Sequence, residues 1–191
     1  MVHARQQTAA GLAALRDLIE PDIDRVIDYW HGGGADLEFL GVDRHLLGTP
    51  DDTRARYLRA LRTGNPDQAN IAFAVTLDDE FVGYTLLNQY TPETNYSHWH
   101  IAVSDKRARG LSTALYPHRI KMYFDSTNMA RLIHQTRTRN IGVNRMLDKF
   151  LSVAETVFVE KPDGVALPGE FNIRYVQRDD IPRLFARTAR E

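Results

Sequence analysis

Cysteine is missing from all 191 residues of the sequence. Its absence excludes disulfides, thiolate metal sites and a cysteine nucleophile. No apolar run approaches the roughly 20 residues of a membrane-spanning helix, and the N-terminus lacks a signal-peptide apolar segment. Neither sign of charge is in excess, with 24 basic and 25 acidic residues, so no nucleic-acid stripe or membrane surface is indicated. We therefore expect a cytoplasmic protein whose partners are neither nucleic acid nor membrane.

The common nucleotide motifs are missing as well. No G-x-x-x-x-G-K-[ST] string and no G-x-G-x-x-G string occurs, which argues against a P-loop and a Rossmann dinucleotide site. The string His31-Gly-Gly-Gly34 is similar to a lipase oxyanion loop, but that fold requires a G-x-S-x-G nucleophile elbow, and the sequence has none. We interpret these glycines as the end of a helix.

The length and the 43% hydrophobic content predict one globular domain over residues 1–191, with a polar, flexible segment at residues 1–10. Apolar periodicity predicts strands and helices that build a mixed sheet with helices on both sides. The predicted strands are 12–16, 70–77, 80–87, 96–103, 131–136, 154–159 and 171–176, and the predicted helices are 20–30, 50–63, 111–124, 140–151 and a short one from 179.

The stretch from Tyr96 to Phe124 combines a strand, a basic turn and a helix N-terminus. The first-turn amides of a helix have no internal partners, and the helix dipole favours an anion there. Lys106, Arg107 and Arg109 add positive charge, and Gly110 lets the backbone approach a ligand closely. This turn is a candidate phosphate cradle, although an ordinary solvated helix start would look the same.

Two motifs in the correct order resemble the GNAT superfamily of acyl-CoA-dependent N-acyltransferases. Arg107-x-x-Gly110-x-Ser112 matches its [QR]-x-x-G-x-[GA] pyrophosphate turn, except that Ser112 replaces Gly or Ala. The segment Asn140–Phe150 resembles the N-x-x-[SV]-x-R-x-L-[ED]-K helix of the branch with ribosomal-protein N-terminal acetyltransferases. The resemblance implies an α/β (α+β) fold with a mostly antiparallel sheet of six to seven strands, splayed at the central strands.

The resemblance also implies acetyl-CoA, or another acyl-CoA, as co-substrate. Backbone amides at Ala102 and Val103 would hold the thioester carbonyl, Asn140 would contact the pantetheine arm, and Asn144 would assist. The bland alternatives are a helix cap for Asn140 and a surface position for Asn144. The implied coenzyme-binding residues are Ala102, Val103, Arg107, Ala108, Arg109, Gly110, Leu111, Ser112, Asn140 and Asn144.

For the catalytic base we predict His100 or His98, which share one face of the strand because side chains alternate. An imidazole suits proton transfer near neutral pH, whereas relatives often carry a carboxylate on this face. The alternative is that both are hydrogen-bonded sheet residues. A zinc site with His134 lacks a carboxylate to complete it, so we expect no metal.

No general acid is evident. The resemblance places a tyrosine seven residues after Asn140, but that position is Leu147 here. Tyr90, Tyr96 and Tyr116 are substitutes without further support.

The predicted reaction is transfer of an acyl group, most simply acetyl, from acyl-CoA to a primary amine of a small molecule or peptide. Without cysteine, direct attack in a ternary complex is favoured over a thioacyl-enzyme. Two alternatives remain open: other chemistry on a CoA- or carrier-bound acyl group, such as decarboxylation, and a non-catalytic acyl-CoA-binding module. The protein would be a monomer or a homodimer. The acceptor would lie among residues 31–50, 88–95 and 162–170, which carry no recognisable motif.

Overall fold

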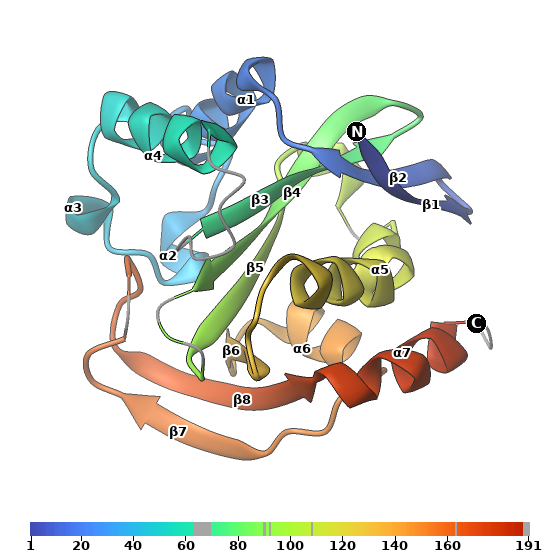
Figure 1. Ribbon diagram of the computed structural model, residues 1–191. Coiled ribbons are helices and arrows are strands. Elements are labelled where there is room, and N and C mark those ends of the chain that lie inside the picture. The colour runs from blue at the N-terminus through green and yellow to red at the C-terminus, as the bar shows by residue number, and fades with distance from the viewer. Residues whose placement is uncertain (63–69, 90, 92, 108, 163, 189–191) are drawn as a thin grey trace.

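The computed structural model describes residues 1–62, 70–89, 91, 93–107, 109–162 and 164–188. One eight-stranded sheet has the order β1-β2-β3-β4-β5-β6-β8-β7 (Figure 1). The strands are β1 (Val2–Thr8), β2 (Gly11–Asp17), β3 (Asn70–Leu77), β4 (Glu80–Gln89), β5 (Asn95–Ile101), β6 (Arg131–Arg137), β7 (Glu155–Val159) and β8 (Gly169–Gln177). The helices are α1 (Glu20–His31), α2 (Leu37–Leu40), α3 (Arg44–Leu47), α4 (Pro50–Arg62), α5 (Leu111–Ser126), α6 (Ile141–Asp148) and α7 (Ile181–Thr188), with 3₁₀ turns η1 (Ser104–Lys106) and η2 (Arg178–Asp180).

The predicted mixed, mostly antiparallel sheet with helices on both faces is confirmed. The predicted number of strands, six to seven, was too low, because the sheet has eight. Val2–Thr8 pairs with β2 in an antiparallel hairpin, where a flexible end was predicted. The strand is mostly polar because it lies at the sheet edge. The N-terminal ammonium bonds Asp17 at 2.7 Å, and His3 packs edge-on against Phe73. Edge strands can be polar on both faces, so composition alone concealed this one.

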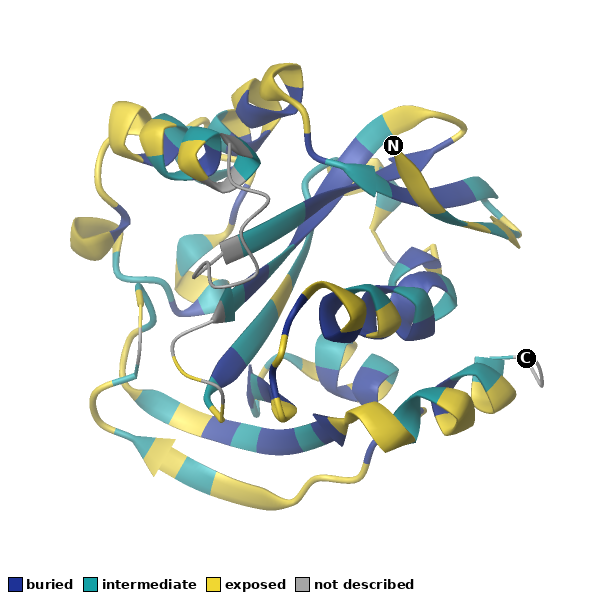
Figure 2. Ribbon diagram, viewed as in Figure 1, coloured by how far each residue is buried: buried dark blue, intermediate teal, exposed yellow. Residues whose placement is uncertain are grey.

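Alternating side chains on the central strands divide the core into two layers. On β4, Tyr84 packs with Tyr29 and Tyr57 beneath α1 and α4. Leu87 and Phe73 face the other way and pack against α5. Buried residues therefore occupy both sides of the sheet, as Figure 2 shows. No helix within the described ranges is long and apolar enough to cross a membrane.

The sheet parts between β5 and β6. These two strands run parallel and are joined at one register pair, Tyr96 with Ile133. Beyond that pair, β5 stays with β4 and β6 stays with β8. The amides of Ala102 and Val103 both donate to the Val82 carbonyl, at 2.8 and 3.1 Å, which is the pattern of a β-bulge. A bulge bends the strand, so the end of β5 can diverge from β6 and leave room for a ligand.

Candidate active site

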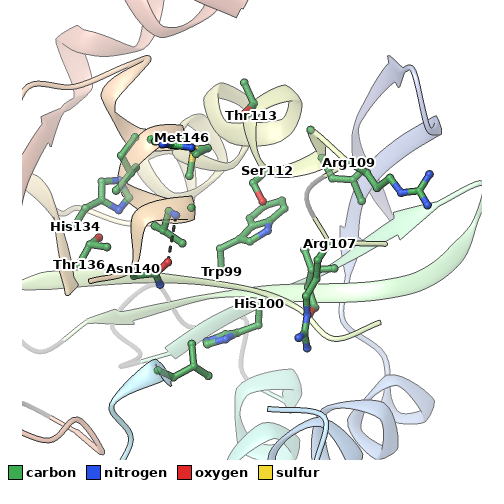
Figure 3. A pocket seen from close by; sticks show the side chains of 18 of the residues that line it. Trp99, His100, Arg107, Arg109, Ser112, Thr113, His134, Thr136, Asn140 and Met146 are labelled. Carbon is green, nitrogen blue, oxygen red and sulfur yellow. Dashed lines mark hydrogen bonds between the residues drawn. The ribbon is translucent and has the colours of Figure 1, made fainter. Parts of the chain in front are cut away.

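A cavity of about 550 Å³ lies at the parting of the sheet, and Figure 3 shows side chains that line it. Trp99 lines it and contacts Arg119 on the α5 side. His100 also lines it and contacts Tyr29 of α1 on the opposite side. Because neighbouring β5 residues point to opposite faces, the cavity passes through the sheet. A ligand could therefore enter from one face and meet a second molecule from the other.

One end of the cavity is the turn before α5. Gly110 has φ 78°, a left-handed conformation that favours glycine, and a Cβ there would meet no atom within 4 Å. The first intrahelical bond runs from the Ala114 amide to the Gly110 carbonyl, so the amides of residues 111–113 precede the helical ladder. Lys106, Arg109 and Ser112 line the cavity beside them. The predicted cradle is open and cationic, while Ala108 lies outside the described residues.

Arg107 is used differently from the prediction. Its Nε donates to the Ile101 carbonyl at 3.1 Å, and its terminal nitrogen donates to the Gly34 carbonyl at 2.8 Å. The guanidinium thereby ties the turn to the loop that follows α1. Its charge remains beside the cavity, but its main role in this structure is to hold the turn in place. Leu111 is buried in the core between α5 and the sheet and anchors the helix start.

The backbone donors predicted for the thioester carbonyl need correction. The amides of Ala102 and Val103 both already donate to Val82. Amides alternate in direction along an antiparallel strand, so the amide of Ile101, next to Ala102, faces away from β4. Trp99 lies two residues earlier and has the same orientation. The amides that face the parting are therefore those of Trp99 and Ile101, while the bulge turns the amide of Val103 toward Val82.

The two asparagines of the α6 motif lie in different environments. Asn140 caps α6, accepting from the Val143 amide at 3.3 Å, and it also lines the cavity. Asn144 is buried away from it; its Nδ2 donates to the carbonyls of Arg137 and Asn140, at 2.8 and 3.0 Å. Its Oδ1 accepts from Asn172 and Arg174. The prediction that Asn144 assists in pantetheine binding is therefore not supported by its position.

His100 lies at the cavity and His98 does not line it. The His100 ring stacks on Tyr84 at 5.1 Å, and its Nδ1 lies 3.3 Å from the Tyr29 hydroxyl. Loss of hydration, with smaller effects of His98 and Arg107, lowers the pKa of His100 to about 3. Loss of hydration and Arg119 lower the pKa of His98 to about 4, although part of its surface is exposed. These lowered pKa values keep both rings neutral near pH 7, and the role of His100 or His98 as the base stays a prediction.

Of the predicted substitute acids, the two that the structure describes, Tyr96 and Tyr116, do not line the cavity. Tyr116 is buried and bonds His134 at 2.9 Å, and burial raises the pKa of Tyr116 far above its ordinary value. Leu147 lines the cavity where the resemblance places a tyrosine. Tyr96 packs with the strands of the β6–β8 side, and Tyr90 is outside the described residues. No three histidine, aspartate or glutamate side chains gather as a metal site in the ranges that the structure describes.

Three cavity residues carry no motif and were missed. Asp36 and Tyr29 lie on the α1–α2 side, and Arg119 of α5 lies on the other. Asp36 caps α2 by accepting from the Phe39 amide at 2.9 Å, so its position before an apolar run was a detectable helix signal. Nothing local indicates that it faces a cavity, because the loop that places it has no regular periodicity.

The fold, with its parted sheet and glycine turn, is similar to that of several solved acetyltransferase structures. Mycobacterium smegmatis RimJ, in complex with CoA-disulfide, is 16% identical with a TM-score of 0.70, covering 97% of this chain and 94% of that chain. The ribosomal L7/L12 acetyltransferase RimL, in complex with coenzyme A, is 12% identical with a TM-score of 0.73, covering 94% and 99%. Vibrio cholerae spermidine N-acetyltransferase, with CoA and spermine, is 11% identical with a TM-score of 0.68, covering 89% and 98%.

No family model and no curated protein sequence matches this chain. At these identities the likeness shows the fold, and the chemistry must be argued from the residues of this cavity.

Proposed function

We propose that the protein transfers an acyl group from acyl-CoA to a primary amine. The observation that carries this proposal is the cavity through the sheet, with a cationic, amide-rich turn at one end and Asp36 with His100 toward the other face. Two reactants can meet there without sharing an entrance. Holding two reactants together in this way is the main requirement of direct acyl transfer.

The coenzyme would occupy the α5–α6 side. Its diphosphate would accept bonds from the amides that begin α5, with Lys106 and Arg109 supplying charge. The pantetheine arm would lie along the open edge of β5 beside Asn140. The amide of Ile101 or Trp99 would donate to the thioester oxygen as it gains negative charge. RimJ, RimL and the spermidine acetyltransferase contain CoA in structures of the same fold, which supports this placement.

The amine would enter from the α1–α2 side. Asp36 is a carboxylate on that side of the cavity and would attract an ammonium ion. When the His100 Nδ1 holds the proton and donates to Tyr29, Nε2 is free to accept a bond from the neutral amine. A group with a pKa of about 3 orients the amine but binds its proton weakly, so the proton passes to water. The C–N bond forms, the C–S bond breaks, and the coenzyme leaves as a thiolate that solvent protonates.

The test is release of free thiol together with amide formation, measured with acetyl-CoA and longer acyl-CoA donors against a panel of polyamines, amino acids and peptides. Loss of the negative charge in Asp36→Asn should lower kcat/KM for a cationic amine about tenfold, since asparagine caps helices as well as aspartate does. The matched control is Asp43→Asn, because Asp43 caps α3 and does not line the cavity. The proposal fails if no amine in the panel is acylated. The role of Asp36 fails if both variants lose activity equally.

A further inference from the structure

Arg119 is a buried cation without a hydrogen bond. Its residue is 2% exposed, and it lines the cavity from the third turn of α5. Its Nε is buried with no partner, and it forms no hydrogen bond or ion pair with any described residue. A guanidinium has five N–H donors and cannot lose its charge in proteins, so acceptors are missing from this site.

Two aromatic rings hold the guanidinium in position without satisfying those donors. Its central carbon lies 5.1 Å from the Trp99 ring centre and 5.2 Å from the Tyr116 ring centre. Contacts with ring faces compensate part of the lost hydration, but the N–H groups lie in the guanidinium plane and require oxygen acceptors. Trp99 adds a second buried donor, because its Nε1 also has no partner. Both unsatisfied side chains line the same cavity, and both can only donate.

The position of Arg119 relative to the reaction centre defines what it could meet. The backbone of Trp99 borders the parting where the thioester carbonyl would lie, and its ring extends toward α5 and Arg119. The amine side, with His100, is on the opposite face. An acyl chain that extends from the carbonyl away from the amine would therefore point toward Arg119. The oxygen acceptors that are missing would have to come from the far end of that chain.

Building on the proposed function, we propose that Arg119 binds a carboxylate at the far end of the acyl group, so that the acyl donor is a dicarboxylic acyl-CoA. A carboxylate has the two acceptor oxygens that a guanidinium binds in parallel. An acetyl group would leave the cation without a partner, whereas a malonyl or succinyl group would neutralise it.

The test compares acyl donors that differ in one end group. Succinyl-CoA and butyryl-CoA have chains of equal length, as do malonyl-CoA and propionyl-CoA, and they exchange a carboxylate for a methyl group. Calorimetry without amine gives the affinity of each, and turnover with an accepted amine gives kcat/KM. The wild type should prefer the acid in at least one pair by about tenfold or more. Arg119→Met, which keeps an unbranched apolar stem but removes the guanidinium, should reduce that ratio to about one.

The control is Arg174→Met, which removes another buried arginine that does not line the cavity and should preserve the ratio. Equal affinity for acid and neutral donors in both pairs would overturn the assignment without involving any variant, as would a preference that survives in Arg119→Met. If the protein binds the acidic donors more tightly but forms no amide, the proposed transfer reaction is wrong and the carboxylate-binding role of Arg119 still holds. If butyryl-CoA is used as efficiently as succinyl-CoA, the transfer reaction holds and the role of Arg119 is wrong.

Discussion

Two fully buried arginines, Arg174 of β8 and Arg119 of α5, allow a comparison between a structural region and the candidate site. Arg174 is 1% exposed and donates to the Asn144 Oδ1 at 2.9 Å and to the Asp148 Oδ1 at 2.6 Å. Arg119 is 2% exposed and has no described acceptor. The two side chains are almost equally buried and the Nε of each lacks a partner, but only Arg174 has acceptors at its terminal nitrogens.

The difference follows from what each region must hold together. Arg174 links β8 to α6, and its partners Asn144 and Asp148 are one helical turn apart on the same face of that helix. The protein itself therefore supplies acceptors for both terminal nitrogens of Arg174. Arg119 lines the cavity where β5 and β6 part. A buried cation that lacks acceptors and lines a cavity marks a place where a ligand is expected.

The largest expected effect is on the satisfied arginine. Arg174→Met removes two charge-assisted bonds, and the free energy of unfolding should fall by about 2 kcal/mol. The loss stays moderate because Asp148 is 57% exposed and can be hydrated when its partner is gone. Urea denaturation monitored by circular dichroism measures it. Asp148→Asn is the milder control, and a loss in that variant as large as in Arg174→Met would show that the ion pair alone matters.

Arg119→Met should raise the free energy of unfolding, whereas Arg174→Met lowers it. An unpaired buried cation costs several kcal/mol, and its two ring contacts return about 1–2 kcal/mol each. We therefore expect the variant to gain about 1 kcal/mol in unfolding free energy, measured in the same urea titration without ligand. A loss of stability as large as that of Arg174→Met would show that Arg119 is a structural residue, and the contrast between the two arginines would disappear.

The smallest expected effect is an electrostatic change in the pKa of His98. Desolvation and, secondarily, Arg119 lower the pKa of His98 to about 4. Removing the cation in Arg119→Met should raise the pKa of His98, although desolvation keeps it below 6.5. Because the folded value lies below the unfolded value, stability falls as pH drops from about 6.5 toward 4, and the variant should lose less stability over that window.

Imidazole NMR titration measures this shift, with Arg174→Met as the control that leaves His98 in place. An identical His98 titration in wild type and Arg119→Met would mean that the guanidinium does not act on this face of the sheet.

Much of the fold could be predicted because it depends on local patterns. The β3–β4 hairpin follows from two apolar strands joined by Asp78 and Asp79, which both adopt positive φ. The end of α1 follows from Gly32, and α6 begins at Asn140, whose side chain caps it. Strand β1 could not be predicted, because a polar edge strand has no local apolar signal.

The candidate site divides along the same line. The turn at Gly110 and the helix cap Asn140 are local features, and both line the cavity as the motifs suggested. The direction of the β5 amides depends on the pairing with β4, where Val82 accepts from both Ala102 and Val103. The low pKa of His100 depends on the aromatic side chains of Tyr29 and Tyr84, which α1 and β4 bring against it. Residues far apart in the chain set both properties.

The sequence by itself determined the order of strands β2 to β8 and of helices α1, α4, α5, α6 and α7, together with the glycine turn before α5 and the α6 motif. Periodicity and caps act over a few residues, so these features can be read locally. Tertiary structure alone decided that Asn144 forms its hydrogen bonds inside the core, that Asp36 faces the cavity and that Arg119 is buried without an acceptor. The physical reason is that hydration and hydrogen-bond partners are properties of the packed molecule. A side chain's partners come from whichever elements the fold places beside it.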